Sequence, residues 1–449
     1  MLLLMVCLSS LLVAFFGYYW NRSQHESKIL DRLGNRIDKV VYDYQLAPDG
    51  KLALDESDTD RKQISDREAP GPKFLRRWFG DKLFASVVHL SLNGNLETEE
   101  TLALSKLSGL KHLKLFQNHN LNSLECLSSV DLDSLSLSDC PKLVKIQLAD
   151  GPRLQDLAIK NCEKLELIEL GGQDSDPSGV GQLKIWGCDR VREIRAGSKS
   201  NLRLLQIDTA DSLEKIGPFE NFQRLESLQI QSDARSQNHP LQRLDFSSTI
   251  PLVSIRVALP GLKEFRSDGL TQLDELLLHT RETDTDFDLS GCQNLRSLEI
   301  ISSPNRKNIQ GPRCSVSGLD VIDQLEKIVF HNVRSKAISE LSDHSKLQDL
   351  ELELCDVSSL TGLSSLRRVM MSACSIENLD ALKESKKIEI LELGFCAGLK
   401  DITEFIQLPT LKVLHVEYCE PLSPICFDRR KGQQAGKATR KSSNFGYSY

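Results

Sequence analysis

Cysteine is the residue type with the widest chemical scope in this sequence. Of the twelve cysteines, eight recur at one position of a repeated motif: Cys140, Cys162, Cys188, Cys292, Cys355, Cys374, Cys396 and Cys419. Thiolates can bind zinc or form disulfides, but no Cys-x-x-Cys pair occurs, and the motif brings no histidine or acidic ligand to this column. We therefore expect a column of buried free thiols, each donating weakly to a backbone carbonyl of its bend. The alternative is a zinc ion bound by the cysteines of successive repeats, such as Cys374, Cys396 and Cys419.

Catalytic motifs are missing from the sequence. It contains no phosphate-binding Gly-rich loop ending in Lys-Ser or Lys-Thr, no His-Glu-x-x-His and no Gly-x-Ser-x-Gly. His415 and Cys419 share one repeat, but strand alternation directs His415 outward and the motif places Cys419 inward, which excludes a nucleophile–base pair. We predict no catalytic, cofactor-binding or metal-binding residue, and hence no enzyme.

The elements that position the cysteines repeat with a fixed period. Leu132-x-x-Leu135-x-Leu137-x-x-Cys140 returns 22 residues later as Leu154-x-x-Leu157-x-Ile159-x-x-Cys162. This pattern resembles the leucine-rich-repeat family in the form that has Cys at the turn. The resemblance implies an α/β solenoid, a horseshoe or arc with a parallel concave sheet and short extended or helical convex segments. Each unit buries its apolar face only by stacking on its neighbours.

About sixteen repeats are expected from residue 87 to residue 426. The predicted concave strands have their cores at Leu90, Leu113, Leu135, Leu157, Leu183, Leu205, Leu228, Leu244, Phe265, Phe287, Ile328, Leu350, Val369, Leu391 and Leu414. The register is not fixed between Leu228 and Leu244 or between Phe287 and Ile328, where the spacing departs from the period.

The segments outside the repeats differ in composition. Residues 1–20 contain no charged side chain and, at about 1.5 Å per helical residue, reach about 30 Å, which predicts a transmembrane anchor or a cleaved signal segment. Residues 21–72 read as a polar linker with one strand near residues 37–44, residues 73–86 as an N-terminal cap or membrane-surface helix, and residues 427–449 as a disordered basic tail. The order of apolar segment, spacer, Pro-Gly-Pro and Leu-Arg-Arg-Trp-Phe-Gly-Asp cap resembles bacterial membrane-anchored leucine-rich-repeat proteins. The resemblance implies a membrane protein with a single N-terminal anchor, and the side of the membrane stays open.

The remaining candidate site is the exposed side of the concave strands. A formal net charge of −7 is too mild to favour nucleic acid as the main partner. The outward positions form the candidate partner-binding set: Lys114, Phe116, Lys160, Lys184, Trp186, His331, Glu351, Glu353, Glu392, His415 and Glu417. The early half is basic with two rings and the late half is acidic. We predict a non-enzymatic scaffold that binds a protein, or a polysaccharide, on this face. A cytoplasmic adaptor resembling the F-box kind and a structural envelope protein are the alternatives.

Overall fold

The computed structural model describes most of the chain. The described residues are 2–45, 73–124, 127, 130–148, 154–170, 179–197, 200–232, 239–282, 284–303, 314–357, 362–376, 382, 385–399, 401–419, 425–428 and 436–437. The chain forms two compact parts, residues 1–222 and 223–449, which we call the N-terminal and C-terminal parts.

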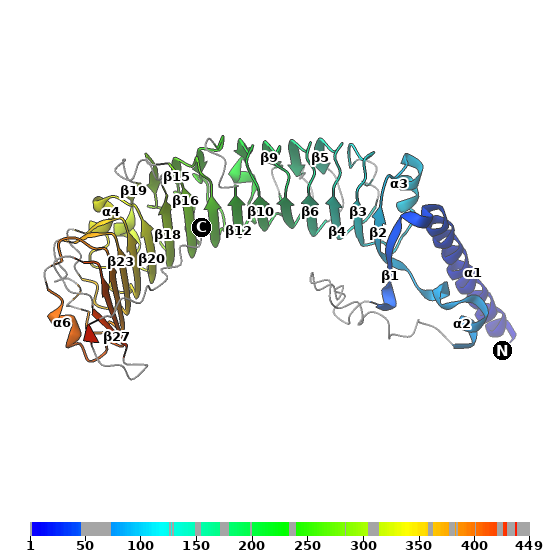
Figure 1. The fold of residues 1–449 in the computed structure, drawn as a ribbon. Coiled ribbons are helices and arrows are strands. Elements are labelled where there is room, and N and C mark those ends of the chain that lie inside the picture. Colours follow the sequence, from blue (N-terminus) through cyan, green and yellow to red (C-terminus); the bar gives the residue numbers. More distant parts are fainter. Residues whose placement is uncertain are drawn as a thin grey trace. The chain divides into compact units, whose positions relative to one another are not determined.

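The N-terminal part is a coil of parallel strands. Its main sheet consists of β2 (Val87–Asn93), β3 (His112–Phe116), β4 (Ser134–Ser138), β6 (Asp156–Lys160), β8 (Gln182–Trp186) and β10 (Leu204–Asp208). Its second sheet consists of β5 (Lys145–Leu148), β7 (Leu167–Leu170), β9 (Glu193–Ala196) and β11 (Lys215–Ile216). From β4 onward the chain alternates between the two sheets, so each turn of the coil adds one strand to each (Figure 1).

The C-terminal part repeats this arrangement. Its main sheet consists of β12 (Ser227–Gln231), β14 (Ser254–Ala258), β16 (Glu275–Thr280), β18 (Ser297–Ser302), β20 (Lys327–His331), β21 (Asp349–Glu353), β23 (Arg368–Ser372), β25 (Ile390–Gly394) and β26 (Val413–Glu417). The return segments carry β13 (Arg243–Asp245), β15 (Glu264–Arg266), β17 (Asp286–Asp288), β19 (Ser315–Ser317), β22 (Asp356–Val357) and β24 (Ser375–Ile376). Two returns contain short helices, α4 (Ser335–Ser339) and α6 (Thr403–Ile406). The predicted solenoid with a parallel sheet and short extended or helical returns is confirmed.

Equivalent apolar residues stack from coil to coil. Leu113, Leu135, Leu157 and Leu183 are register partners in consecutive strands, and each has at most 2% of its surface exposed. Outward-facing residues alternate with these buried leucines along each strand, because successive side chains of a strand point to opposite faces of the sheet. The core is therefore a continuous column of side chains, which is how a coil that cannot bury its own apolar face becomes stable.

Three of the predicted concave strands are wrong. Leu244, Phe265 and Phe287 lie in β13, β15 and β17, which with β19 form the second sheet of the C-terminal part. The main-sheet strands of these coils are β14, β16 and β18. In this region both sheets alternate an inward apolar residue with an outward polar one, so period-two alternation does not identify the sheet. Cys292 consequently lies at the opposite bend, between β17 and β18, and not in the turn column.

The N-terminal end of the coil is covered by a cap. Helix α1 (Leu2–Leu33) runs past the expected anchor, and β1 (Ile37–Tyr42) pairs antiparallel with β2 (Figure 1). The segment expected to begin a polar linker at residue 21 thus contributes a helix and a strand, because Ile29 and Leu33 are buried and the sheet edge takes up β1. Helix α2 (Lys73–Phe79) and the 3₁₀ helix η3 (Asp81–Phe84) precede β2. Residues 46–72 lie outside the described residues, and among those described no helix has the length and apolar character needed to cross a membrane.

The last main-sheet strand is also covered. Strand β27 (Ile425–Asp428) pairs antiparallel with β26, and β28 (Gly436–Lys437) pairs with β27. Part of the tail expected to be disordered from residue 427 therefore forms strands, because the open edge of a parallel sheet presents unpaired backbone groups. The other residues predicted as tail lie outside the described residues.

Candidate binding surface on the main sheet

The cysteine turns close each coil in the same way. Seven thiols donate to the carbonyl two residues earlier, which is the last residue of the main-sheet strand, at Sγ–O distances of 3.2–3.5 Å; they belong to Cys140, Cys162, Cys188, Cys355, Cys374, Cys396 and Cys419. All seven are buried and in the thiol form. The residue between carbonyl and thiol has a positive φ, for example 55° at Asp139 and 52° at Asn161. The predicted thiol column is confirmed at these seven positions.

These bends, together with the in-register apolar columns, decide the fold. It is a leucine-rich-repeat solenoid. Its exposed main-sheet positions are consequently the surface on which stacking places equivalent side chains about 4.7–4.9 Å apart.

In the N-terminal part, the predicted residues gather on four neighbouring strands of this solenoid. One row contains Lys114, Ser136, Ala158 and Lys184, and the adjacent row contains Phe116, Ser138, Lys160 and Trp186. In the first row the two lysines thus stand on either side of serine and alanine, and in the second row Lys160 lies directly beside Trp186. Within the residues that the structure describes, the ammonium groups of Lys114, Lys160 and Lys184 form no ion pair. We call Lys114, Phe116, Lys160, Lys184 and Trp186 the basic patch.

In the C-terminal part, the predicted residues form an acidic surface. Glu351 and Glu353 lie on β21, Glu392 on β25, and Glu417 on β26 beside His415. His331 Nδ1 lies 3.2 Å from Glu353 Oε2, and the same imidazole is the main cause of a lowered pKa of the Glu351 carboxyl. His415 Nε2 lies 3.4 Å from Glu417 Oε2. The structure therefore brings the eleven predicted residues together as two groups, one in each part.

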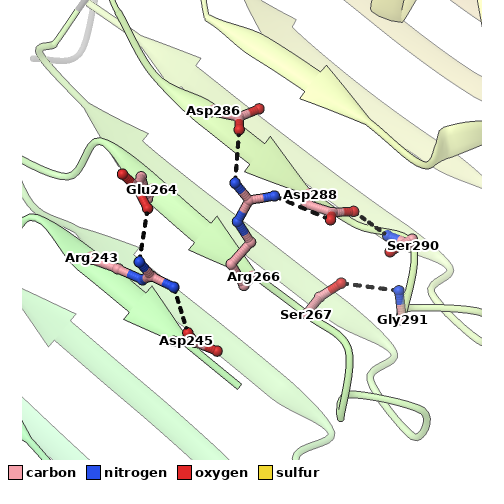
Figure 2. Close-up of polar contacts among 9 residues, drawn as sticks. All are labelled: Arg243, Asp245, Glu264, Arg266, Ser267, Asp286, Asp288, Ser290 and Gly291. Carbon is pink, nitrogen blue, oxygen red and sulfur yellow. Dashed lines mark hydrogen bonds and ion pairs between the residues drawn. The ribbon is translucent and has the colours of Figure 1, made fainter. Parts of the chain in front are cut away.

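The charges of the second sheet are arranged differently, because opposite signs pair within the sheet. Figure 2 shows Arg266 between Asp286 and Asp288, with N–O distances of 3.0 and 3.3 Å. Arg243 is 2.7 Å from Asp245 and 3.4 Å from Glu264. Such exposed pairs contribute little stability, but they leave little net charge to attract a ligand.

The same pairing occurs on the second sheet of the N-terminal part. Glu169 lies 3.1 Å from Lys145 and 3.3 Å from Arg195, and Arg195 also lies 2.6 Å from Glu193. In that part, the unpaired lysines described above belong to the main sheet. The two sheets therefore differ in the charge that they offer to a partner.

Sequence reasoning missed one feature of this surface. Phe395 and Tyr418 occupy the positive-φ position of their bends, and their rings stack with centroids 4.7 Å apart and an interplanar angle of 11°. Both side chains are about half exposed. The sequence carries a signal for it, because each residue directly precedes a turn cysteine, but strand alternation does not reach these bend positions.

Comparisons with known proteins find similar solved structures, all at low sequence identity. No protein-family model matches the sequence, and no curated protein does. The chain is similar to an internalin from Listeria monocytogenes (13% identity, 75% of this chain and 87% of that one, TM-score 0.33). It is also similar to a leucine-rich-repeat protein from Leptospira interrogans (15% identity, 71% and 92%, TM-score 0.30) and to one from Eubacterium ventriosum (11% identity, 75% and 90%, TM-score 0.23).

Proposed function

We propose that this solenoid is a non-enzymatic scaffold that binds a protein through the exposed face of its main sheet. The basic patch is the observation that carries the proposal. Its lysines are unpaired among the described residues, and its two rings are partly exposed on the same face, Phe116 beside Ser138 and Trp186 beside Lys160, so a partner can cover both rings. Aromatic residues surrounded by polar groups are typical anchors of protein interfaces.

The partner segment that fits this patch is acidic and carries apolar side chains. Carboxylates would pair with Lys114, Lys160 and Lys184, while apolar groups would cover Phe116 and Trp186. Because the lysines are partly hydrated, their charge contributes more to the association rate and to specificity than to affinity. The rings contribute most of the affinity through burial.

Affinity capture with the full chain tests this proposal. Trp186→Ala and Lys184→Glu change the basic patch, and Lys215→Glu is a matched charge reversal on the second sheet of the same part. We expect a partner that is retained by the wild type and by Lys215→Glu and is lost with both patch variants. Equal retention by all four proteins would contradict the choice of surface.

We also propose that the N-terminal segment tethers the solenoid to a membrane. Support comes from residues 1–20, which contain no charged side chain, and from exposed apolar side chains beside them. Trp78 and Phe74 on α2 are 81% and 65% exposed, and Tyr18 on α1 is 62% exposed. Exposed rings next to basic residues such as Arg77 suit the interface of an anionic bilayer.

Vesicle flotation tests the tether. The full chain should float with vesicles that contain anionic lipid, and deletion of residues 1–20 should leave it at the bottom of the gradient. Trp78→Ser should weaken binding, whereas Phe219→Ser, on the solenoid, should leave it unchanged. Flotation that survives the deletion would contradict an anchor in that segment.

A further inference from the structure

Four consecutive bends of the C-terminal part carry an apolar row. Leu354, Ala373, Phe395 and Tyr418 have φ values between 51° and 55°, each one residue before a turn cysteine. Left-handed backbone disfavours residues with a Cβ, and bulky ones are outliers there. The equivalent positions of the N-terminal part hold Gln117, Asp139, Asn161, Gly187 and Thr209. Backbone preference therefore does not account for the apolar row.

The row has a gap at Ala373. The N–H of Ala373 donates to the carbonyl of Gly394 at 2.8 Å, and the N–H of Phe395 donates to that of Glu417 at 2.9 Å, so the bends follow one another coil by coil. One face of the Phe395 ring lies on Tyr418, and the next position on its other side is the exposed methyl of Ala373. Leu354 lies two coils away from Phe395, which is about 9.5 Å at the usual spacing between neighbouring strands. After the two van der Waals radii, this leaves space for about one flat group.

The strands beside the gap supply negative charge. Glu353 directly precedes Leu354, and its register partner on β23 is the uncharged Ser372. Glu392 on β25 is the register partner of Met370, and its carboxylate has no ion pair among the described residues. Carboxylates thus flank β23 on both neighbouring strands. A guanidinium already lies along this strand, since Arg368 Nη2 is 2.8 Å from Met370 Sδ.

We propose that Ala373 marks a slot for an arginine side chain of a basic partner peptide. The planar guanidinium lies on the free face of the Phe395 ring and pairs with Glu353 or Glu392. Lysine satisfies the charge but not the stacking, because its ammonium group is a compact point charge. This site is separate from the basic patch on which the proposed function rests.

Two fluorescent peptides of equal length, oligo-arginine and oligo-lysine, test the slot on the full chain. The wild type should bind oligo-arginine about two- to fivefold more tightly, the range expected for an exposed cation–π contact. Phe395→Asn removes the ring while keeping a residue that tolerates positive φ, and Ala373→Phe fills the gap. Both variants should bind the two peptides equally, and Glu392→Gln should weaken both peptides alike.

Two controls keep the test separate from the proposed function. Gln117→Asn changes the same bend position in the N-terminal part, and Trp186→Ala removes the anchor of the basic patch. Both should keep the preference for arginine. The slot is refuted if the wild type binds neither peptide, binds both equally, or if the preference survives in Phe395→Asn and Ala373→Phe.

Discussion

The carboxylate of Glu26, on α1, accepts a hydrogen bond from the backbone N–H of Val87, the first residue of β2, with Oε2 and N 3.3 Å apart. Glu26 is buried and also pairs with Arg22 at 3.1 Å. This carboxylate therefore connects the N-terminal helix to the first strand of the main sheet. It satisfies a backbone donor at the start of β2 that water would otherwise have to reach.

Replacement of Glu26 should loosen the cap. A hydrogen bond to a charged group contributes about 1.5–3 kcal/mol, so Glu26→Ala should lower the free energy of unfolding of the N-terminal part by about 2 kcal/mol. Urea unfolding followed by circular dichroism measures the change. Asp31→Ala, at an exposed position of the same helix, is the control and should change stability by less than about 0.5 kcal/mol. Equal effects of the two substitutions would show that the contact contributes nothing.

A second prediction concerns the sign of an alanine-to-glycine substitution. Ala373 has a φ of 51°, where glycine is free of the steric cost that a Cβ carries, so Ala373→Gly should raise the free energy of unfolding by up to about 1 kcal/mol. Ala158 lies in β6, where glycine adds only entropy to the unfolded chain, so Ala158→Gly should lower it by about 0.5–1 kcal/mol. Chemical unfolding of both variants checks the signs. Destabilisation by both would mean that the bend at Ala373 is not strained.

The solenoid could be predicted from the sequence because the motif that specifies it is short and recurs along the chain. Leu135, Leu137 and Cys140 recur in register 22 residues later, and this pattern has one packing solution. It did not predict which sheet holds Leu244 or Phe265, because both sheets present the same alternation to the core. Only the pairing of β13 with β15, and of β14 with β16, separates them.

The candidate surface was predictable only in part. The outward positions of Lys184 and Trp186 follow from strand alternation, whereas the absence of ion pairs at the basic patch, among the described residues, depends on three-dimensional neighbours. The stack of Phe395 on Tyr418 was missed because the bend position before each turn cysteine holds residues of varied type, so its exposure does not follow from strand alternation. The role of Glu26 was likewise hidden, since its partner Val87 lies 61 positions away in the sequence.

A third prediction concerns thiol reactivity. Burial raises the pKa of the Cys292 thiol to about 12, and Cys314 and the seven turn cysteines are buried as well. In a variant with serine at Cys7, Cys126 and Cys426, a thiol reagent at about pH 8 should label Cys292 of the native chain about a thousandfold more slowly than an ordinary exposed thiol, since the thiolate is the reactive form. Mass spectrometry of labelled peptides checks this, and urea-unfolded protein is the control. Rapid labelling of Cys292 in the native chain would contradict its burial.

The last prediction is a pH dependence that originates at His89. Burial is the main cause that lowers the pKa of this imidazole, on β2 opposite Val41 of β1, to about 3, with Lys114 and His112 adding to it. Its unfolded pKa is about 6.5, so between these values the unfolded chain binds a proton that the folded chain does not. Stability is therefore lost as the pH falls below about 6.5, by about 2 kcal/mol from this group between about pH 7 and pH 5.

Urea unfolding at both pH values isolates this contribution. His89→Leu should reduce the difference in unfolding free energy between the two pH values by about 2 kcal/mol, whatever its effect on packing at either one. His112 also has a pKa lowered mainly by burial, so part of the dependence should remain. His119→Gln, at an exposed position, is the matched control and should keep the wild-type difference. If His89→Leu keeps the full pH dependence as well, the imidazole of His89 is protonated in the folded chain and β1 does not exclude water from it.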